Sequence, residues 1–121
     1  MDIPKEWKAT LEEVSELSAA LTISPGRPIQ ILHLADQLEA TAIEAIANQA
    51  ARAMSRFDAL SMAPRHFRLV FEYGDVYLIP GNNQVSLVIV TGESRRISDD
   101  VLSKLQQTLN QHPAFESNGS A

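Results

Sequence analysis

Two turn signals divide the run from His66 to Thr91, HFRLVFEYGDVYLIPGNNQVSLVIVT, into three apolar segments. Gly74-Asp75 separates the first two segments, and Pro80-Gly81-Asn82-Asn83 separates the second from the third. Glycine and asparagine readily adopt the positive φ angles that tight hairpin turns require. The run therefore predicts three antiparallel strands in a meander, and the rest of the chain has to pack around it.

The register of this meander follows from taking Gly74-Asp75 and Asn82-Asn83 as two-residue turns. Leu78 then faces Phe71 on one side and Leu87 on the other. One face becomes apolar throughout, with Leu69, Phe71, Tyr73, Val76, Leu78, Val85, Leu87 and Ile89. Because a slip of one residue moves a whole strand's side chains to the other face, this agreement supports the predicted register.

The opposite face of the meander is about half apolar, with Arg68, Val70, Glu72, Tyr77, Ile79, Ser86, Val88 and Val90. A sheet face in contact with water should be mainly polar, so we expect something to cover part of this face. Two alternatives are open, a helix of the same chain or the surface of another protein. Leftover apolar surface after folding favours a protein partner.

The composition places the chain among ordinary soluble globular proteins. It has 121 residues, 45% hydrophobic and 21% charged, which predicts one domain over residues 1–113 and a disordered tail at 114–121. A net charge of −5 argues against binding nucleic acid through phosphate neutralisation. We expect a cytoplasmic protein, because the start lacks a signal peptide and no apolar stretch approaches the ~20 residues of a membrane span.

The segment before the meander predicts a helical hairpin. Trp7, Leu11, Val14, Leu17 and Leu21 recur every three or four positions, which predicts an amphipathic helix from about Pro4 to Leu21. The second predicted helix is long, from about Pro28 to Leu60, rich in alanine and free of glycine and proline between them.

A competing interpretation of the second segment makes Ile29 to Leu34 a strand. It places a turn at Asp36-Gln37 and begins the helix near Thr41. We favour the continuous helix, because neither Asp nor Gln supplies a positive φ cheaply. After the meander, Ser98 is placed to cap a last helix, with Ile97 and Leu102 spaced as a hydrophobic staple. The predicted fold class is α+β, in the order α-α-β-β-β-α.

No pattern for catalysis, for a cofactor or for a metal emerges from the sequence. The chain has no cysteine, no phosphate-cradling or dinucleotide-binding glycine motif, and no nucleophile elbow. His33, with Asp36 and Gln37 beside it, lacks further ligands elsewhere, so we expect no metal there. We therefore expect a protein that is not an enzyme and that uses no cofactor.

The stretch SRFDALSMAPRHFRLVFEYGDVYLIPGNNQVSLVIVTGES, followed by a helix, resembles the C-terminal two-thirds of the roadblock domain, the dynein light-chain roadblock type and its bacterial relatives. The similar features are the helix ending near Phe57, the strand RLVFEY, the short strand VYLIP and the very apolar VSLVIVT. The family's order is helix, two strands, helix, three strands, helix, and here its first hairpin is not evident.

The resemblance implies a homodimer that binds a small Ras-like GTPase or supports a larger assembly, through its long helix and the sheet edge. The resemblance and the half-apolar sheet face together indicate a candidate partner interface. It consists of Ile46, Ala50, Ala53, Val70, Glu72, Tyr77, Ile79, Val88 and Val90. An alternative function is that of a small acidic chaperone or adaptor, which would bind a client peptide on its sheet edge. A small-ligand site between helix and sheet is a third alternative.

Overall fold

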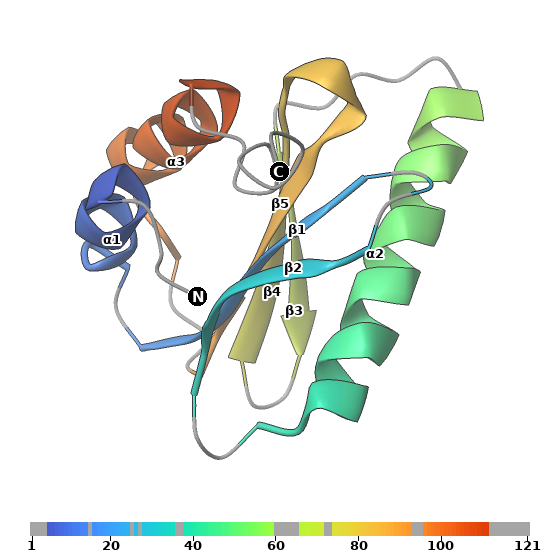
Figure 1. Ribbon diagram of the computed structural model, residues 1–121, viewed down its shortest axis with the longest axis horizontal. Helices are drawn as coiled ribbons and strands as arrows, with labels where there is room; N and C mark the ends of the chain where they lie inside the picture. Colours follow the sequence, from blue (N-terminus) through green and yellow to red (C-terminus); the bar gives the residue numbers. More distant parts are fainter. Residues whose placement is uncertain are drawn as a thin grey trace, which may run out of the picture.

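The computed structural model describes residues 5–14, 16–24, 26, 28–35, 38–59, 66–71, 74–92 and 96–111. Three helices and five strands follow one another along the chain (Figure 1). They are α1 (Lys5–Leu11), β1 (Leu17–Ile23), β2 (Gln30–Leu34), α2 (Ala40–Ala59), β3 (Phe67–Phe71), β4 (Gly74–Pro80), β5 (Ser86–Thr91) and α3 (Asp99–Gln111), with a short 3-10 helix at Asn82–Gln84.

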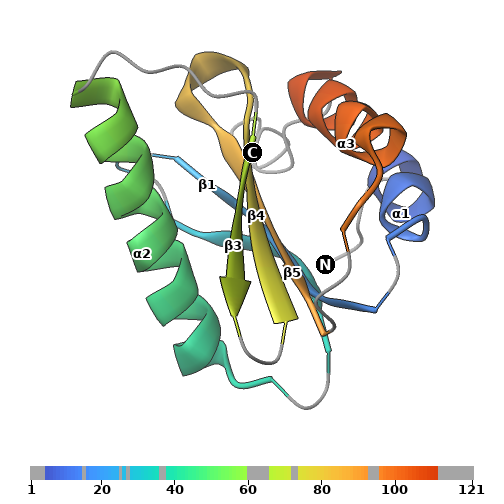
Figure 2. The same ribbon diagram turned by 180° about the vertical axis from the view of Figure 1, so that it is seen from behind.

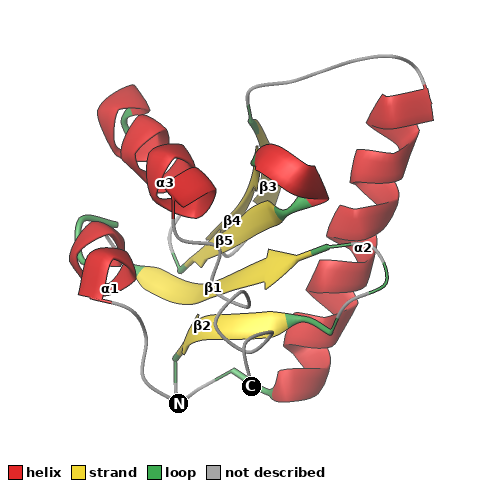
Figure 3. Ribbon diagram, turned by 45° about the horizontal axis from the view of Figure 1, so that its top comes forward, coloured by secondary structure: helices red, strands yellow, loops and turns green. Residues whose placement is uncertain are grey.

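All five strands form one antiparallel sheet in the order β2-β1-β5-β4-β3. The predicted meander is therefore present as β3, β4 and β5, and β1 continues it by pairing with β5 (Figure 3). Helix α2 covers one face of the sheet, while α1 and α3 lie together on the other (Figures 1 and 2). The predicted α+β class is confirmed, but the predicted helical hairpin is wrong.

The predicted helix from Pro4 to Leu21 is correct only for its first part. The helix ends at Leu11, and Leu17 to Ile23 form β1, which is the strand between β2 and β5. A central strand is buried on both faces, so it has no alternation of apolar and polar residues. Ala19 and Ala20 are poor strand formers, and the positive φ of 56° at Glu16 comes without a glycine to signal it.

The predicted helix from Pro28 to Leu60 is also wrong in its first third. The competing interpretation is the correct one, since β2 occupies Gln30–Leu34 and α2 begins at Ala40. The expected turn at Asp36-Gln37 lies outside the described residues. Pairing with β1 makes this segment a strand. The Ala35 N–H donates a hydrogen bond to the Ser18 carbonyl at 2.8 Å, whereas in a continuous helix it would donate to the carbonyl four residues earlier.

The register of the meander differs from the prediction at both turns. Gly74 and Asp75 are the first residues of β4 and not a turn, and Phe71 pairs with Gly74. This moves the β3–β4 pairing by an even number of residues, so each side chain keeps its predicted face. The β4–β5 pairing is displaced by one residue, and Leu78 pairs with Val88 instead of Leu87.

A three-residue loop causes the second displacement. The Gly81 N–H donates to the Val85 carbonyl at 2.8 Å, and Gln84 has a φ of 63°. Three-residue hairpin loops place their last residue in this left-handed region, a position that glycine usually takes. Because the displacement is a single residue, the side chains of β5 lie on the face opposite to the predicted one.

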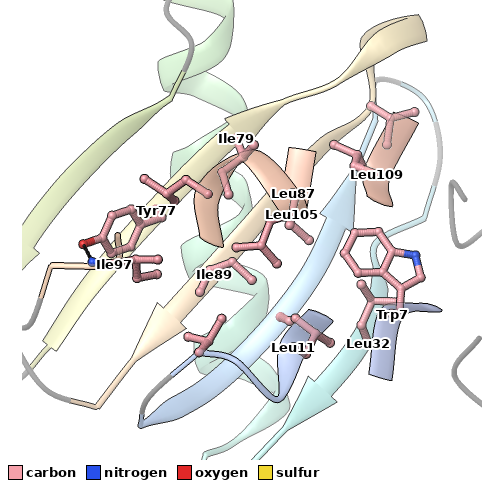
Figure 4. Close-up of a cluster of buried hydrophobic side chains, with 14 residues drawn as sticks. Trp7, Leu11, Leu32, Tyr77, Ile79, Leu87, Ile89, Ile97, Leu105 and Leu109 are labelled. Carbon is pink, nitrogen blue, oxygen red and sulfur yellow. Dashed lines mark hydrogen bonds between the residues drawn. The ribbon is translucent and has the colours of Figure 1, made fainter. Parts of the chain in front are cut away.

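Both faces of the sheet are consequently core. Under α1 and α3 lie Tyr77, Ile79, Leu87 and Ile89, packed with Trp7, Leu11, Leu105 and Leu109 (Figure 4). Under α2 lie Leu21, Val76, Leu78 and Val88, packed with Ile43, Ala47 and Ala50. The half-apolar face thus follows the first of the two alternatives, because helices of the same chain cover most of it.

The C-terminal helix begins as predicted. The Val101 N–H donates to the Ser98 hydroxyl at 3.3 Å, and both residues of the expected staple, Ile97 and Leu102, are buried. The Ile97 N–H also donates to the Tyr77 hydroxyl at 2.9 Å, which ties the start of α3 to the sheet (Figure 4).

The proposed tail at 114–121 lies outside the described residues. Among those described, no helix has the length and hydropathy to cross a bilayer.

Gly74 offers a direct test of the observed register. A Cβ atom built at this position would collide with the carbonyl oxygen of Thr91 on β5. Since the obstacle is backbone inside a sheet, we expect Gly74→Ala to lower the free energy of unfolding by about 1–3 kcal/mol, measured by urea denaturation.

Gly92→Ala is the matched control for Gly74→Ala. Its Cβ would meet the Ser18 hydroxyl at 3.2 Å, and that side chain can rotate. The Glu16 carbonyl oxygen, at 3.6 Å, lies at an ordinary van der Waals distance. We expect its effect to stay within about 0.5 kcal/mol. Equal effects at the two glycines would contradict the close approach of β4 to β5 described above.

Candidate functional site

The sheet edge at β3 carries two of the three large hydrophobic side chains that are exposed among the described residues. Val70 is 61% exposed and Leu69 41% exposed, and these neighbours point to opposite faces of the sheet. Because β3 pairs with β4 on one side only, its other side carries backbone N–H and C=O groups without strand partners. Apolar side chains and free hydrogen-bonding groups thus occur together along one edge.

An ion pair fixes this edge strand to its neighbour. The Arg68 side chain on β3 donates from Nε to Oδ2 of Asp75 on β4 at 2.7 Å, and its Nη2 lies 2.6 Å from the same oxygen. The Asp75 side chain is fully buried, whereas that of Arg68 is 29% exposed. The guanidinium carbon also lies 5.8 Å from the centre of the Tyr77 ring.

Thr91 completes this cluster from β5. The Asp75 N–H donates to the Thr91 hydroxyl at 3.3 Å, so the cluster extends over three neighbouring strands. Paired charges inside a sheet hold backbone positions more strictly than apolar contacts do, because their geometry is directional. The edge strand is therefore held in one position relative to β4.

One flank of α2 is available beside the core of the sheet. Ile43, Ala47 and Ala50 are buried against the strands, while Ile46 and Ala53 are only partly buried. The last two residues lie seven positions apart, which places them on one side of the helix, about two turns apart. Small and aliphatic side chains at such positions allow another helix to approach closely.

A cavity opens on the other flank of α2. Its volume is about 570 Å³, and it lies between the second half of the helix, the end of β1 and the loop between β4 and β5. Its described lining is Ile23, Ser24, Gly26, Ile29, Ala47, Asn48, Ala51, Met54, Ser55, Pro80, Gly81, Gln84 and Ser86. No residue of this set carries a charge. The sequence analysis offered a small-ligand site between helix and sheet as an alternative but assigned no residues to it, because nothing in the sequence shows that these residues come together.

The described residues show no arrangement for metal chemistry. His33 is exposed on β2, His66 is partly buried before β3, and His112 lies outside the described part, as do Asp36 and Gln37. Within the residues that the structure describes, no three histidine or acidic side chains gather closely enough to hold a metal ion.

The comparison with solved structures identifies the fold. A Roadblock/LC7 domain from Streptomyces avermitilis, solved by crystallography, superposes on this chain with a TM-score of 0.64. The match covers 96% of this chain and 98% of that one, at 13% sequence identity. The chain has the Roadblock/LC7 fold. Neither a family model nor a curated protein matches the sequence.

The match confirms the resemblance seen in the sequence and extends it to nearly the whole chain. The first hairpin, which is not evident from the sequence, is present in this roadblock fold as β1 and β2. It was hidden because β1 has the apolar spacing of a helix and the continuous apolar character of a central strand.

The roadblock fold separates the predicted interface residues into three groups. Ala50, Tyr77, Ile79 and Val88 are at most 2% exposed, so they serve the packing of the chain itself and are not accessible to a partner. Ile46, Ala53 and Val90 are partly buried, and Val70 is well exposed. Glu72 lies outside the described residues.

Tyr77, Ile79 and Val88 were chosen because they lie on the half-apolar face of the predicted meander, and Ala50 because the resemblance implies contacts through the long helix. In the structure α1 and α3 cover one face of the sheet and α2 covers the other, while β1 and β2 extend the sheet beyond β5. The predicted register assigned Leu69 to the apolar face of the meander, yet its position on the edge strand leaves it exposed. What remains of the candidate interface is the β3 edge and the flank of α2 with Ile46 and Ala53, and their contact with a partner stays a prediction.

Proposed function

We propose that this protein is a homodimeric protein-interaction module without catalytic activity, in which two copies join through the β3 edge and the adjacent flank of α2. The observation that carries the proposal is the exposure of Leu69 and Val70 on an edge strand. Folded proteins avoid long apolar edges unless another chain covers them. A second copy supplies an identical edge, so antiparallel pairing would satisfy both strands around a two-fold axis.

A comparison of the two sheet edges supports the choice of β3. The other edge strand, β2, pairs with β1 irregularly, with a shift in register between Ala20 and Leu21. Bulges of this kind twist an edge away from further strand pairing. The pairing of β3 with β4 is regular along all five residues, and Arg68 anchors it. Only β3 has both the regular geometry and two adjacent exposed apolar side chains.

The flank of α2 adds a second contact region. The cavity-lining residues Asn48, Ala51 and Ser55 lie next to the end of β1, and Ile46 and Ala53 lie about halfway around the helix from them. The latter pair therefore faces the side of the sheet on which β3 lies. Two copies paired along β3 would bring their α2 helices together, with alanine and isoleucine between them.

The roadblock resemblance extends this proposal to a partner class. It implies that such a dimer binds a small Ras-like GTPase or forms part of a larger assembly. Each copy carries a net charge of −5, and contact through the apolar side chains of the β3 edge avoids placing like charges against each other. A client peptide added to the same edge would compete with the second copy, and this is the alternative function.

The first test is the mass of the protein in solution. Sedimentation equilibrium at micromolar concentration is expected to give about twice the chain mass of 13.3 kDa. We expect Val70→Lys and Leu69→Lys each to weaken dimerisation at least tenfold, about 1.4 kcal/mol. The two-fold axis would bring each new charge close to the same charge on the other protomer.

Ile31→Lys is the control, since Ile31 on the β2 edge has the same 41% exposure as Leu69. We expect dimerisation to change less than twofold in this variant. A monomer at all concentrations would refute self-association and leave the peptide-binding alternative. Equal weakening by Ile31→Lys would show that the β3 edge is not the specific contact.

A further inference from the structure

We infer that the cavity beside α2 is a binding site for a small neutral organic molecule with an apolar body and an amide or hydroxyl group. This inference is independent of the proposed dimer. It concerns the flank of α2 away from β3, so binding there leaves the dimer surface unobstructed.

The size of the cavity fits such a ligand. At about 570 Å³ it falls within the range of 300–1,000 Å³ that is typical of small-molecule sites. Short side chains create the space, because Ala47 and Ala51 occupy the helix positions where larger residues would fill it. The site is reachable from water, since Ala51, Ser55 and Gln84 are exposed.

The lining determines the chemical class. Ile23, Ile29 and Met54 provide an apolar wall, and Asn48, Ser55 and Gln84 bring amide and hydroxyl groups that can fix a polar atom. The described lining residues include no charged side chain, so none of them offers a charged ligand an ion pair in exchange for its hydration. A neutral ligand with one or two hydrogen-bonding groups meets no such cost.

The conformation of Gln84 is a second observation at the same place. This residue has a φ of 63°, a left-handed conformation that is uncommon for residues other than glycine, asparagine and aspartate. The three-residue loop between β4 and β5 requires this conformation at its last residue, and glycine, which usually takes the position, would bring no side chain to the cavity. Here the strained residue lies in the wall of the cavity.

The test is a titration of the ¹⁵N-labelled full chain with N-acetyl-L-tryptophanamide and N-acetyl-L-leucinamide, which are neutral and have apolar bodies with amides. We expect saturable chemical-shift changes at the backbone amides of Asn48, Ala51, Ser55 and Gln84 with at least one of these probes. The carboxylate N-acetyl-L-tryptophan should bind at least fivefold more weakly than its amide.

Two cavity-filling variants make the test specific. Ala51→Phe is expected to weaken binding at least tenfold, and Ser55→Phe serves the same purpose if the first variant does not fold. Ala45→Phe is the matched control, because Ala45 is exposed on α2 outside the cavity lining, and its binding should be unchanged. The absence of saturable binding with both probes would overturn the inference. So would binding that Ala51→Phe and Ser55→Phe leave unaffected. Because the readout is local, it does not depend on whether the chain dimerises.

Discussion

Replacing Trp7 by alanine is expected to lower the free energy of unfolding by about 3–5 kcal/mol, the largest effect of any single change considered. Trp7 has no exposed surface, and its ring lies beside Leu32 under the sheet (Figure 4). Helix α1 has only seven residues, and helices of this length are not stable in isolation. Its attachment therefore depends on what Trp7 and Leu11 bury.

Urea denaturation measures this effect, and amide exchange in α1 shows where it acts. Lys8→Ala is the control on the same helix, because Lys8 is exposed, and we expect a change within about 0.5 kcal/mol. A loss below about 1 kcal/mol for Trp7→Ala would mean that α1 contributes little to the core. The hydrogen bond between the Thr10 and Thr108 hydroxyls, at 3.1 Å, joins α1 to α3. Under that outcome it would also contribute little to stability.

Arg68→Met is expected to cost roughly 2–4 kcal/mol, the second largest effect. The change removes the guanidinium from a carboxylate that has no exposed surface, while keeping most of the apolar length of the side chain. The partial exposure of Arg68 keeps the expected cost below that of a fully buried pair. The change also frees β3 from its anchor on β4, so dimerisation should weaken together with stability.

A double-mutant cycle separates the ion pair from general packing. We expect Arg68→Met combined with Asp75→Val to be more stable than Arg68→Met alone. The single variant buries the Asp75 carboxylate without the Arg68 guanidinium, whereas the double variant has neither charge. If the double variant is instead less stable by the sum of the two single losses, the two side chains act independently. That outcome would contradict their coupling across the edge strand.

The parts of the fold that were predictable are those in which local chemistry and packing agree. Ser98, Ile97 and Leu102 mark the start of α3 by their spacing alone, and the structure places them as expected. The three strands of the meander were also evident, because their apolar runs are bounded by Gly and Asn. The family resemblance rested on these segments, and the structural match confirms it.

The predictions that were wrong concern segments whose structure depends on pairing with strands far away in the sequence. Leu17 to Ile23 have the spacing of a helix, and only pairing with both β2 and β5 makes them a strand. The β4–β5 register depended on whether the loop has two residues or three, and Gln84 in a left-handed conformation carries no sequence signal. For this reason Val88 lies under α2 and not on the predicted face. Tyr77 and Ile79 keep their predicted face and are buried there under α1 and α3, while Val70 is exposed.

The position of β1 between β2 and β5 has a consequence for how the chain folds. The first strand to leave the ribosome occupies a middle place in the sheet, and its neighbour β5 is the last strand to follow. The β1–β2 hairpin and the β3–β4–β5 meander can each form from residues that are close in sequence. The pairing of β1 with β5, which joins them, can form only when almost the whole chain is present. Until then the apolar side of the N-terminal hairpin is uncovered, so the slowest step in folding should be the joining of two preformed halves.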